Sequence, residues 1–316
     1  IRFLLKAQEI EKIYLATSRG KFLTGNLERT EIREKSIDPE IVQNSSISLD
    51  IPATKINIRE FEKGKEKLIE GEISFLKNSK IDLIISDSSS LPFKISKDLN
   101  IKSVFIGNFT WDFIFGNYSK QDVYFFEYSK SLEKEYSYCD LGLILPFNCP
   151  VKYIRDARKV GLVGRSPTLD KLEARDKLGF KDEIKYFLFS FGAYGVKEES
   201  LQLENLREDF RIVISGYEGF KSEKILKVEN IGYPDLITAC DFVVTKPGYG
   251  ILSESYFANT SVIYTDRGDF AEYPYLVEAM KKYHDAYYIS NEDLFKLNFS
   301  EIVLEKMKSK KLIKRE

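Results

Sequence analysis

The stretch that decides the fold is DFVVTKPGYGILSE, residues 241–254. The apolar, β-branched run Phe242–Thr245 predicts a buried strand, which leads into a turn containing Gly248 and Gly250. A helix predicted from Ile251 onward would place its free N–H groups and its positive end at the tip of that strand. This strand–turn–helix order is typical of parallel sheets that bind nucleotides.

The glycine turn alone leaves two interpretations open, an anion site and a plain tight turn. It lacks the GxxxxGK[ST] pattern, and Ser253 occupies the third glycine position of GxGxxG. Glu254 could complement the helix dipole, or it could accept hydrogen bonds from two ribose hydroxyls. A second glycine turn, SFGAYG at 190–195, ends another predicted strand. Two such turns in one sheet favour a nucleotide diphosphate as the ligand.

Outward from this stretch, strands and helices alternate along the chain. Strands are predicted at 12–17, 81–86, 102–107, 141–146, 185–192, 211–216, 224–231, 242–246 and 261–265, with helices at 1–10, 53–78 and 91–100 and an irregular stretch from 18 to about 50. Strands that are each followed by a helix predict βαβ units around parallel sheets. We therefore expect an α/β protein of two Rossmann-like, doubly wound domains facing a central cleft, 1–150 and 151–316. The segment 146–168 crosses between them, and the last helix is a candidate to pack back on the first domain.

Composition narrows the function. The 316 residues carry 48 basic and 49 acidic side chains, a net charge of -1, which argues against a nucleic-acid partner. Three cysteines without a CxxC pair fit a reducing cytoplasm, and no apolar run is long enough to cross a bilayer. The basic tail 306–316 is a candidate for weak contact with an anionic membrane surface, although a solvated terminus is the simpler interpretation.

Several segments resemble the GT-B glycosyltransferases, which join two Rossmann-like domains and hold a nucleotide sugar in the C-terminal one. PGYGILSE followed by DRGDFAEYPYLVEAM is similar to their donor signature. The similarity extends to the bacterial N-acetylglucosaminyltransferase that completes the lipid-linked peptidoglycan precursor. It is closer to the glycosyltransferase-like N-terminal region of plant-type L-arabinokinases, through QNSSISLD, DLIISDSSSLPFKISKDLNIKSVFIGNFTWDFIF, FSFGAYG, YPDLITACDFVVTKPGYGILSE and DRGDFAEYPYL. The kinase half of those proteins has no counterpart here, so arabinose phosphorylation is not implied.

The resemblance implies a donor site at the strand ends of the second domain. It assigns the ribose to Glu254 and the base to the backbone around Tyr233 and Pro234. The diphosphate would lie along Gly248, Tyr249 and Gly250, with Gly192 and Ala193 covering it and Arg267 near the phosphates. The sugar hydroxyls would contact Asp269 and Glu272.

The acceptor side would come from the first domain. Asp87 follows the strand at 81–86 and is a candidate general base, or alternatively a helix cap. Three residues follow the next strand as candidate acceptor contacts, with core packing as the alternative for the tryptophan: Asn108, Trp111 and Asp112. In the family, a first strand and a glycine- and histidine-rich loop precede the helix that here begins at Ile1, so the true base could lie before Ile1.

These observations predict a glycosyltransferase of hexosyl or N-acetylhexosaminyl type. It would move a sugar from a nucleotide diphosphate sugar, UDP-linked, to a hydroxyl acceptor, without a cofactor. No acidic DxD cluster lies beside the turns, and the single histidine, His284, predicted at the surface, supports neither a metal site nor a catalytic triad. Two alternatives stay open, a GT-B-fold sugar-nucleotide 2-epimerase and a non-catalytic nucleotide-sugar-binding protein.

Overall fold

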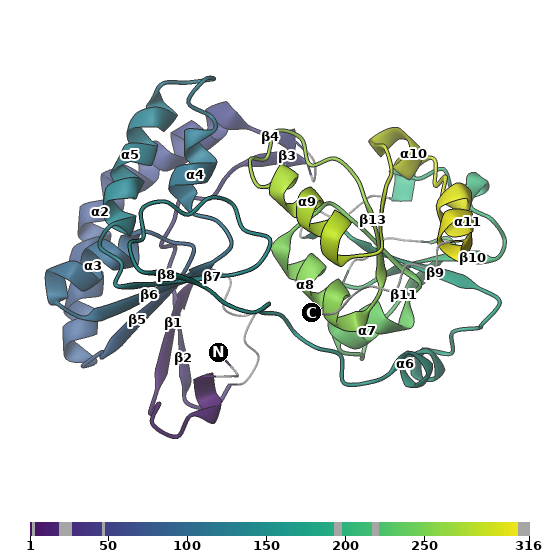
Figure 1. Cartoon of the computed structure of the whole chain (residues 1–316), viewed down its shortest axis with the longest axis horizontal. Coiled ribbons are helices and arrows are strands. Elements are labelled where there is room, and N and C mark those ends of the chain that lie inside the picture. Colours follow the sequence, from purple (N-terminus) through teal and green to yellow (C-terminus); the bar gives the residue numbers. More distant parts are fainter. Residues whose placement is uncertain (2–3, 19–26, 46–47, 193–197, 217–220, 309–316) are drawn as a thin grey trace.

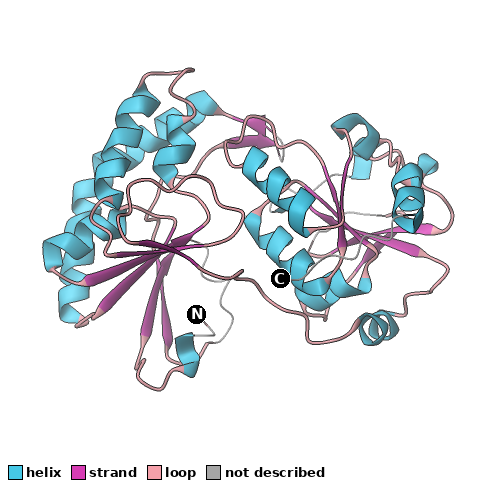
Figure 2. Cartoon of the chain, in the orientation of Figure 1, coloured by secondary structure: helices cyan, strands magenta, loops and turns pink. Residues whose placement is uncertain are grey.

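The chain forms two α/β halves that lie side by side, each built on its own parallel sheet (Figures 1 and 2). The computed structural model describes residues 1, 4–18, 27–45, 48–192, 198–216 and 221–308. Within this part of the chain, no helix combines the length and the apolarity that a membrane span requires.

The second sheet has six parallel strands in the order β11-β10-β9-β12-β13-β14. Their bounds are β9 Lys185–Ser190, β10 Phe210–Ile214, β11 Ile225–Lys227, β12 Phe242–Thr245, β13 Ser261–Tyr264 and β14 Ala286–Tyr288. The chain winds outward from β9 to β11 and then restarts at β12 on the other side of β9. The order therefore reverses between β9 and β12, and ligands of such sheets bind beyond the strand ends at that switch point.

Helices cover both faces of this sheet, and its strands are accordingly continuous apolar runs. The helices are α6 Lys171–Leu178, α7 Tyr233–Ala239, α8 Tyr249–Ala258, α9 Tyr273–Tyr283, α10 Asn291–Phe295 and α11 Ser300–Lys308, with short 3₁₀ turns η3 Glu198–Ser200 and η4 Leu203–Asn205. The buried Phe187 lies against Phe210, Phe242 and Phe299. Phe299 immediately precedes α11, and Val303 joins the same core, so the last helix packs on the second sheet and not on the first half as anticipated.

The first sheet contains β5 Leu83–Asp87, β6 Lys102–Gly107, β7 Leu141–Ile144 and β8 Ala157–Lys159, in that order and all parallel. One face packs against helices α2 Ile51–Asn78, α3 Leu91–Leu99, α4 Trp111–Gly116 and α5 Tyr124–Tyr136. On the other face, Leu83 and Ile85 are 46% and 44% exposed. Because β8 pairs with β7, the first sheet continues past residue 150, where the sequence prediction ended the first domain.

The N-terminal region differs most from the prediction. The stretch expected to be irregular contains β2 Thr30–Glu34, which pairs in parallel with β1 Ile13–Thr17, and the antiparallel β3 Gln43–Ser45 and β4 Ser48–Leu49. The sequence of β2 is rich in charged residues, so no apolar run marks it as a strand, and an edge strand needs none. The helix expected at 1–10 is one 3₁₀ turn, η1 Leu4–Lys6. A stretch this short is marginal as a helix without tertiary support.

Candidate functional site

The glycine turn before α8 and Gly192, which follows β9, both lie at the switch point of the second sheet. Gly248 is the N-cap of α8 in an extended conformation, and a Cβ at this position would meet nothing within 4 Å. Gly192, after β9, has a φ of 68°, in the left-handed region that favours glycine. The Thr245 hydroxyl donates to the Ser190 carbonyl at 2.5 Å and so joins the ends of β12 and β9. The N-terminus of α8 therefore lies beside the end of β9 at the switch point.

Two cations lie at the glycine turn. Arg267 donates to the Pro247 carbonyl at 2.9 Å, and Lys246 directly precedes that proline. Desolvation, with repulsion by Arg267, lowers the pKa of Lys246 to about 8. An anion bound beside this lysine would favour its charged form and raise its pKa again. Together with the helix dipole, the pair makes the turn electropositive.

Glu254 lies on α8, 8% exposed, and accepts a hydrogen bond from Arg165 Nε at 2.5 Å. The Arg165 side chain is 60% exposed while that of Glu254 is 10% exposed, so the arginine can turn away into solvent but the carboxylate cannot. The Arg165 guanidinium also lies 5.8 Å from the ring of Tyr233, whose hydroxyl donates to Ser190 Oγ at 2.6 Å. Glu254, Tyr233 and the end of β9 thus surround one position, with an exposed arginine beside it.

The segment that connects the halves crosses α8 next to this position. The Val163 N–H donates to the Tyr249 hydroxyl at 3.0 Å. A Cβ on Gly164 would lie 2.7 Å from Ser253 Oγ and 3.2 Å from the Phe257 ring, so only glycine fits here without a shift. The crossing segment, residues 160–165, is therefore bound to the helix that starts at the glycine turn.

A polar network joins the first half to the second. Asn108 Nδ2, after β6, donates to Glu272 Oε1 at 2.6 Å, and Glu272 Oε2 pairs with Arg267 at 3.0 Å. Lys246 Nζ also donates to Gln43 Oε1 of β3 at 3.3 Å. The structure brings Asn108, Arg267 and Glu272 together, although the sequence assigned Asn108 to the acceptor side and the other two to the donor. Both Glu272 oxygens have protein partners, and their contact with a sugar stays a prediction.

Asp87, at the tip of β5, faces the glycine turn from the first half. Its side chain is solvent-accessible yet surrounded by protein, and this desolvation raises its pKa although Ser88 Oγ donates to it at 3.4 Å. Its charge acts on the Tyr249 phenol, whose pKa burial already raises. The N-cap residue of α3 is Ser90, so Asp87 does not occupy the capping position.

Asp38 is a residue that sequence reasoning missed. Ser89 Oγ donates to Asp38 Oδ1 at 2.7 Å, yet burial raises the pKa of Asp38 to about 6, with further contributions from Glu135 and Asp87. The residue lies in a polar stretch with no motif, and only the folded chain brings it beside Asp87. Lys246 and Arg165 were also missed, although Lys246 stands inside the quoted stretch.

Trp111 and Asp112 have neighbours within the first half. The Trp111 ring packs on Phe109 at 5.0 Å and stacks on Phe115 at 5.4 Å. Asp112 is buried, which raises its pKa to about 6, and its charged neighbours include Glu133 and Lys130 of α5. Their role as acceptor contacts stays a prediction.

The other predicted residues are placed as follows. Pro234 is buried in the first turn of α7, Asp269 is exposed after β13, and Gly250 is the second residue of α8. Ala193 lies outside the described residues, as do positions 309–316 of the basic tail. His284 was expected at the surface and is buried, 7% exposed, because the chain turns there from α9 back beneath α8. Its Nε2 lies 2.8 Å from the Leu252 carbonyl, and burial lowers its pKa. Among the described residues, no three His, Cys, Asp or Glu side chains are grouped to hold a metal.

Solved structures with the same arrangement identify the fold. The chain superposes on the glycotransferase of kitacinnamycin (TM-score 0.61, 13% identity, 94% of this chain and 83% of that one). It superposes similarly on the calicheamicin glycosyltransferase CalG4 (TM-score 0.59, 13% identity, 95% of this chain and 83% of that one). A third match is Phytolacca americana UGT2 in complex with UDP-2fluoro-glucose and pterostilbene (TM-score 0.61, 12% identity, 95% of this chain and 84% of that one). The chain has the GT-B fold.

Sequence comparison connects this GT-B chain to a longer protein. The L-arabinokinase of Arabidopsis thaliana is 27% identical over an alignment of 277 residues that covers 84% of this chain. The chain spans about a quarter of that relative, 26% of its length. No family model matches the chain.

Proposed function

We propose that this GT-B chain transfers a sugar of hexose or N-acetylhexosamine type from a UDP-linked donor to a hydroxyl acceptor. The observation that carries the proposal is the pair Lys246 and Arg267 beside an open helix N-terminus, at the switch point of a six-stranded Rossmann-like sheet. Cations and free N–H groups at such a point suit a diphosphate. That Phytolacca americana UGT2 shares the fold and binds UDP-2fluoro-glucose supports a UDP-sugar as the ligand.

In this proposal the donor lies across the switch point. Its diphosphate contacts the glycine turn, Lys246 and Arg267, and its ribose hydroxyls donate to Glu254. The exposed Arg165 already contacts the Glu254 carboxylate, so the ribose would either share that carboxylate with Arg165 or displace the arginine from it. The base lies toward Tyr233, and Gly192 leaves room for close approach of the backbone.

The chemistry follows from this placement. The acceptor oxygen attacks the anomeric carbon, the bond to the diphosphate oxygen breaks, and UDP leaves with the bonding pair. Lys246, Arg267 and the α8 dipole stabilise the charge that develops on the leaving oxygen, a task that needs neither a metal nor a cofactor. Asp87 takes the acceptor proton, and its raised pKa makes it a stronger base than a free aspartate.

Replacing Glu254 with glutamine tests the donor site. We expect the dissociation constant for UDP to rise by about tenfold or more, because a hydrogen bond to a charged group contributes about 1.5–3 kcal/mol. The loss of the dipole contact should cost only about 0.3–1 kcal/mol of stability. Calorimetric titration of UDP into both proteins, with thermal melting alongside, measures the two effects.

The matched control is Arg165→Gln, which removes the exposed partner of the same carboxylate. It should bind UDP as well as the parent chain or more tightly, because it frees the carboxylate. Equal UDP affinities for the parent chain and Glu254→Gln would mean that Glu254 does not bind the ribose and that the glycine turn is only a tight turn.

The lowered pKa of Lys246 predicts a pH dependence of UDP binding. A bound diphosphate favours the charged lysine and raises its pKa, so binding takes up a proton once the pH exceeds about 8. UDP affinity should be flat between about pH 7 and 8 and should then fall, approaching about tenfold per pH unit. In Lys246→Arg the guanidinium stays charged, and the fall should disappear. A parent affinity that stays constant to pH 9.5 would contradict the placement of the diphosphate.

Turnover is tested by incubating the chain with UDP-glucose or UDP-N-acetylglucosamine and a panel of hydroxyl acceptors, while the release of UDP is followed. Acceptor-dependent release that persists in EDTA supports a metal-independent transferase. UDP binding without release for any acceptor would instead indicate a binding protein.

A further inference from the structure

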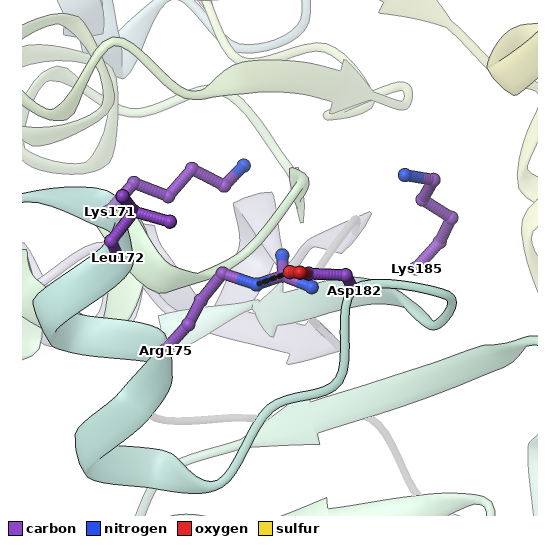
Figure 3. Close-up of a pocket in the computed structure, with 5 residues that line it drawn as sticks. All are labelled: Lys171, Leu172, Arg175, Asp182 and Lys185. Carbon is purple, nitrogen blue, oxygen red and sulfur yellow. Dashed lines mark ion pairs between the residues drawn. The ribbon is translucent and has the colours of Figure 1, made fainter.

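A basic pocket lies where the central strand β9 begins, at the end of the strand away from the switch point (Figure 3). It has a volume of about 340 Å³ and is lined by Lys171, Leu172, Arg175, Asp182 and Lys185. Lys185 begins β9 and Ser190 ends it, so about 16 Å of strand separates the pocket from the switch point. The pocket is therefore distinct from the donor site.

The basic pocket holds more positive than negative charge. Lys171 and Arg175 both pair with Asp241, at 3.3 and 3.4 Å. Desolvation alone would raise the pKa of Asp241, but Lys171, the Tyr186 N–H and neighbouring cations lower it, so it is firmly ionised. Its single charge is shared between two cations.

Two further lysines add to the excess of positive charge in the basic pocket. Lys185 forms no ion pair within the described part of the chain, although its charge helps to lower the pKa of Asp241 and of Asp209. Lys306 of α11 lies beside the pocket, and its pKa is lowered by burial and by repulsion from Lys171. In Figure 3 the Lys171 and Lys185 side chains extend toward each other from opposite sides, with Arg175 and Asp182 between them.

Arg175 supplies a buried donor that faces this space. The residue is 6% exposed, and its terminal nitrogens bond to carbonyls, including that of Lys181 at 2.7 Å. Within the described residues its Nε has no hydrogen-bond partner. The nearest carboxylate oxygen, from Asp182, is 3.9 Å away on a side chain that is 95% exposed. A buried, unsatisfied donor of this kind costs stability unless a ligand completes it.

We propose that the basic pocket binds the phosphate group of a small molecule. A phosphate oxygen accepts from Arg175 Nε in place of Asp182, and Lys171 and Lys185 approach the remaining oxygens from either side. A dianion with three terminal oxygens matches one fixed guanidinium and two mobile ammonium groups better than a single carboxylate does. The volume lies within the range of small-molecule sites. This inference does not depend on the proposed sugar transfer.

The test is calorimetric titration of inorganic phosphate and of glucose 1-phosphate into the full chain at constant ionic strength. Lys185→Gln should weaken phosphate binding by about tenfold, the usual effect of losing a charged hydrogen-bond donor. The matched control, Lys177→Gln, removes the same charge from an exposed position on α6 outside the pocket and should change nothing. Asp182→Asn, which removes the competing carboxylate, should tighten binding by up to about fivefold.

The two probes distinguish the source of the phosphate: equal affinities indicate phosphate alone, and tighter binding of glucose 1-phosphate indicates a phosphorylated metabolite. UDP titration of Lys185→Gln should match the parent chain, which separates this pocket from the donor site. No saturable phosphate binding, or equal weakening by Lys185→Gln and Lys177→Gln, overturns the proposal. Binding of an RNA oligomer or of anionic vesicles through Lys185, without phosphate binding, also overturns it.

Discussion

Replacing Lys246 with methionine should lower the rate of sugar transfer by about 10²–10³-fold, the usual effect of removing one preorganised group that stabilises a developing negative charge. Lys246 lies beside Arg267 at the open N-terminus of α8, where the leaving diphosphate would gather its charge. Methionine keeps most of the side-chain volume, so the fold should be retained. Rates of UDP release under saturating donor measure the effect.

Two comparisons make this result specific. Lys246→Arg restores the charge and should recover most of the rate, whereas Lys63→Met, at an exposed position on α2, should leave it unchanged. If Lys246→Met transfers sugar at the parental rate, the lysine does not stabilise the leaving group.

Replacing Glu272 with leucine should lower the free energy of unfolding by about 3–5 kcal/mol, because it leaves the partly buried Arg267 without its carboxylate. The same change removes the acceptor of Asn108 Nδ2, which joins the first half to the second. Urea denaturation followed by tryptophan fluorescence measures the loss, since Trp111 is the single tryptophan of the chain.

The double variant Arg267→Met with Glu272→Leu provides the internal comparison. Removing both charges should cost less than Glu272→Leu alone, since no unpaired buried charge remains. A double variant that loses the sum of the two single effects would show that the charges act independently.

The second sheet could be predicted from sequence because its chemistry is local. Parallel strands buried on both faces must be apolar runs, as Phe242–Thr245 is, and the glycine turn after it marks where the strand ends and a helix begins. The edge strand β2 escaped prediction because TEIRE carries three charges in five residues. A sequence pattern predicts strands that are buried on both faces, but it gives little indication of strands at the edge of a sheet.

The site was predictable only in the same local sense. Gly248, Gly250 and Glu254 stand together in one motif, so their shared position follows from the helix they begin. Arg165 and Asp38 reach the site from segments without a pattern, through contacts that span 89 and 51 residues. His284 was wrongly predicted at the surface, because its sequence neighbours are charged although its own side chain is buried.

The crossing segment also determines how the halves can move. The Val160 N–H still bonds to Ile144 of the first sheet, while Leu162 packs against the core beside α8 and Val163 bonds to Tyr249. Only Gly161 lies between these anchors, with no neighbour around the position of a Cβ. One residue allows almost no separation, since consecutive Cα atoms are about 3.8 Å apart, but its two dihedrals allow rotation. Gly161 thus allows rotation at this crossing, while the Asn108–Glu272 hydrogen bond and the packing of Phe147 beside α8 hold the two halves together elsewhere.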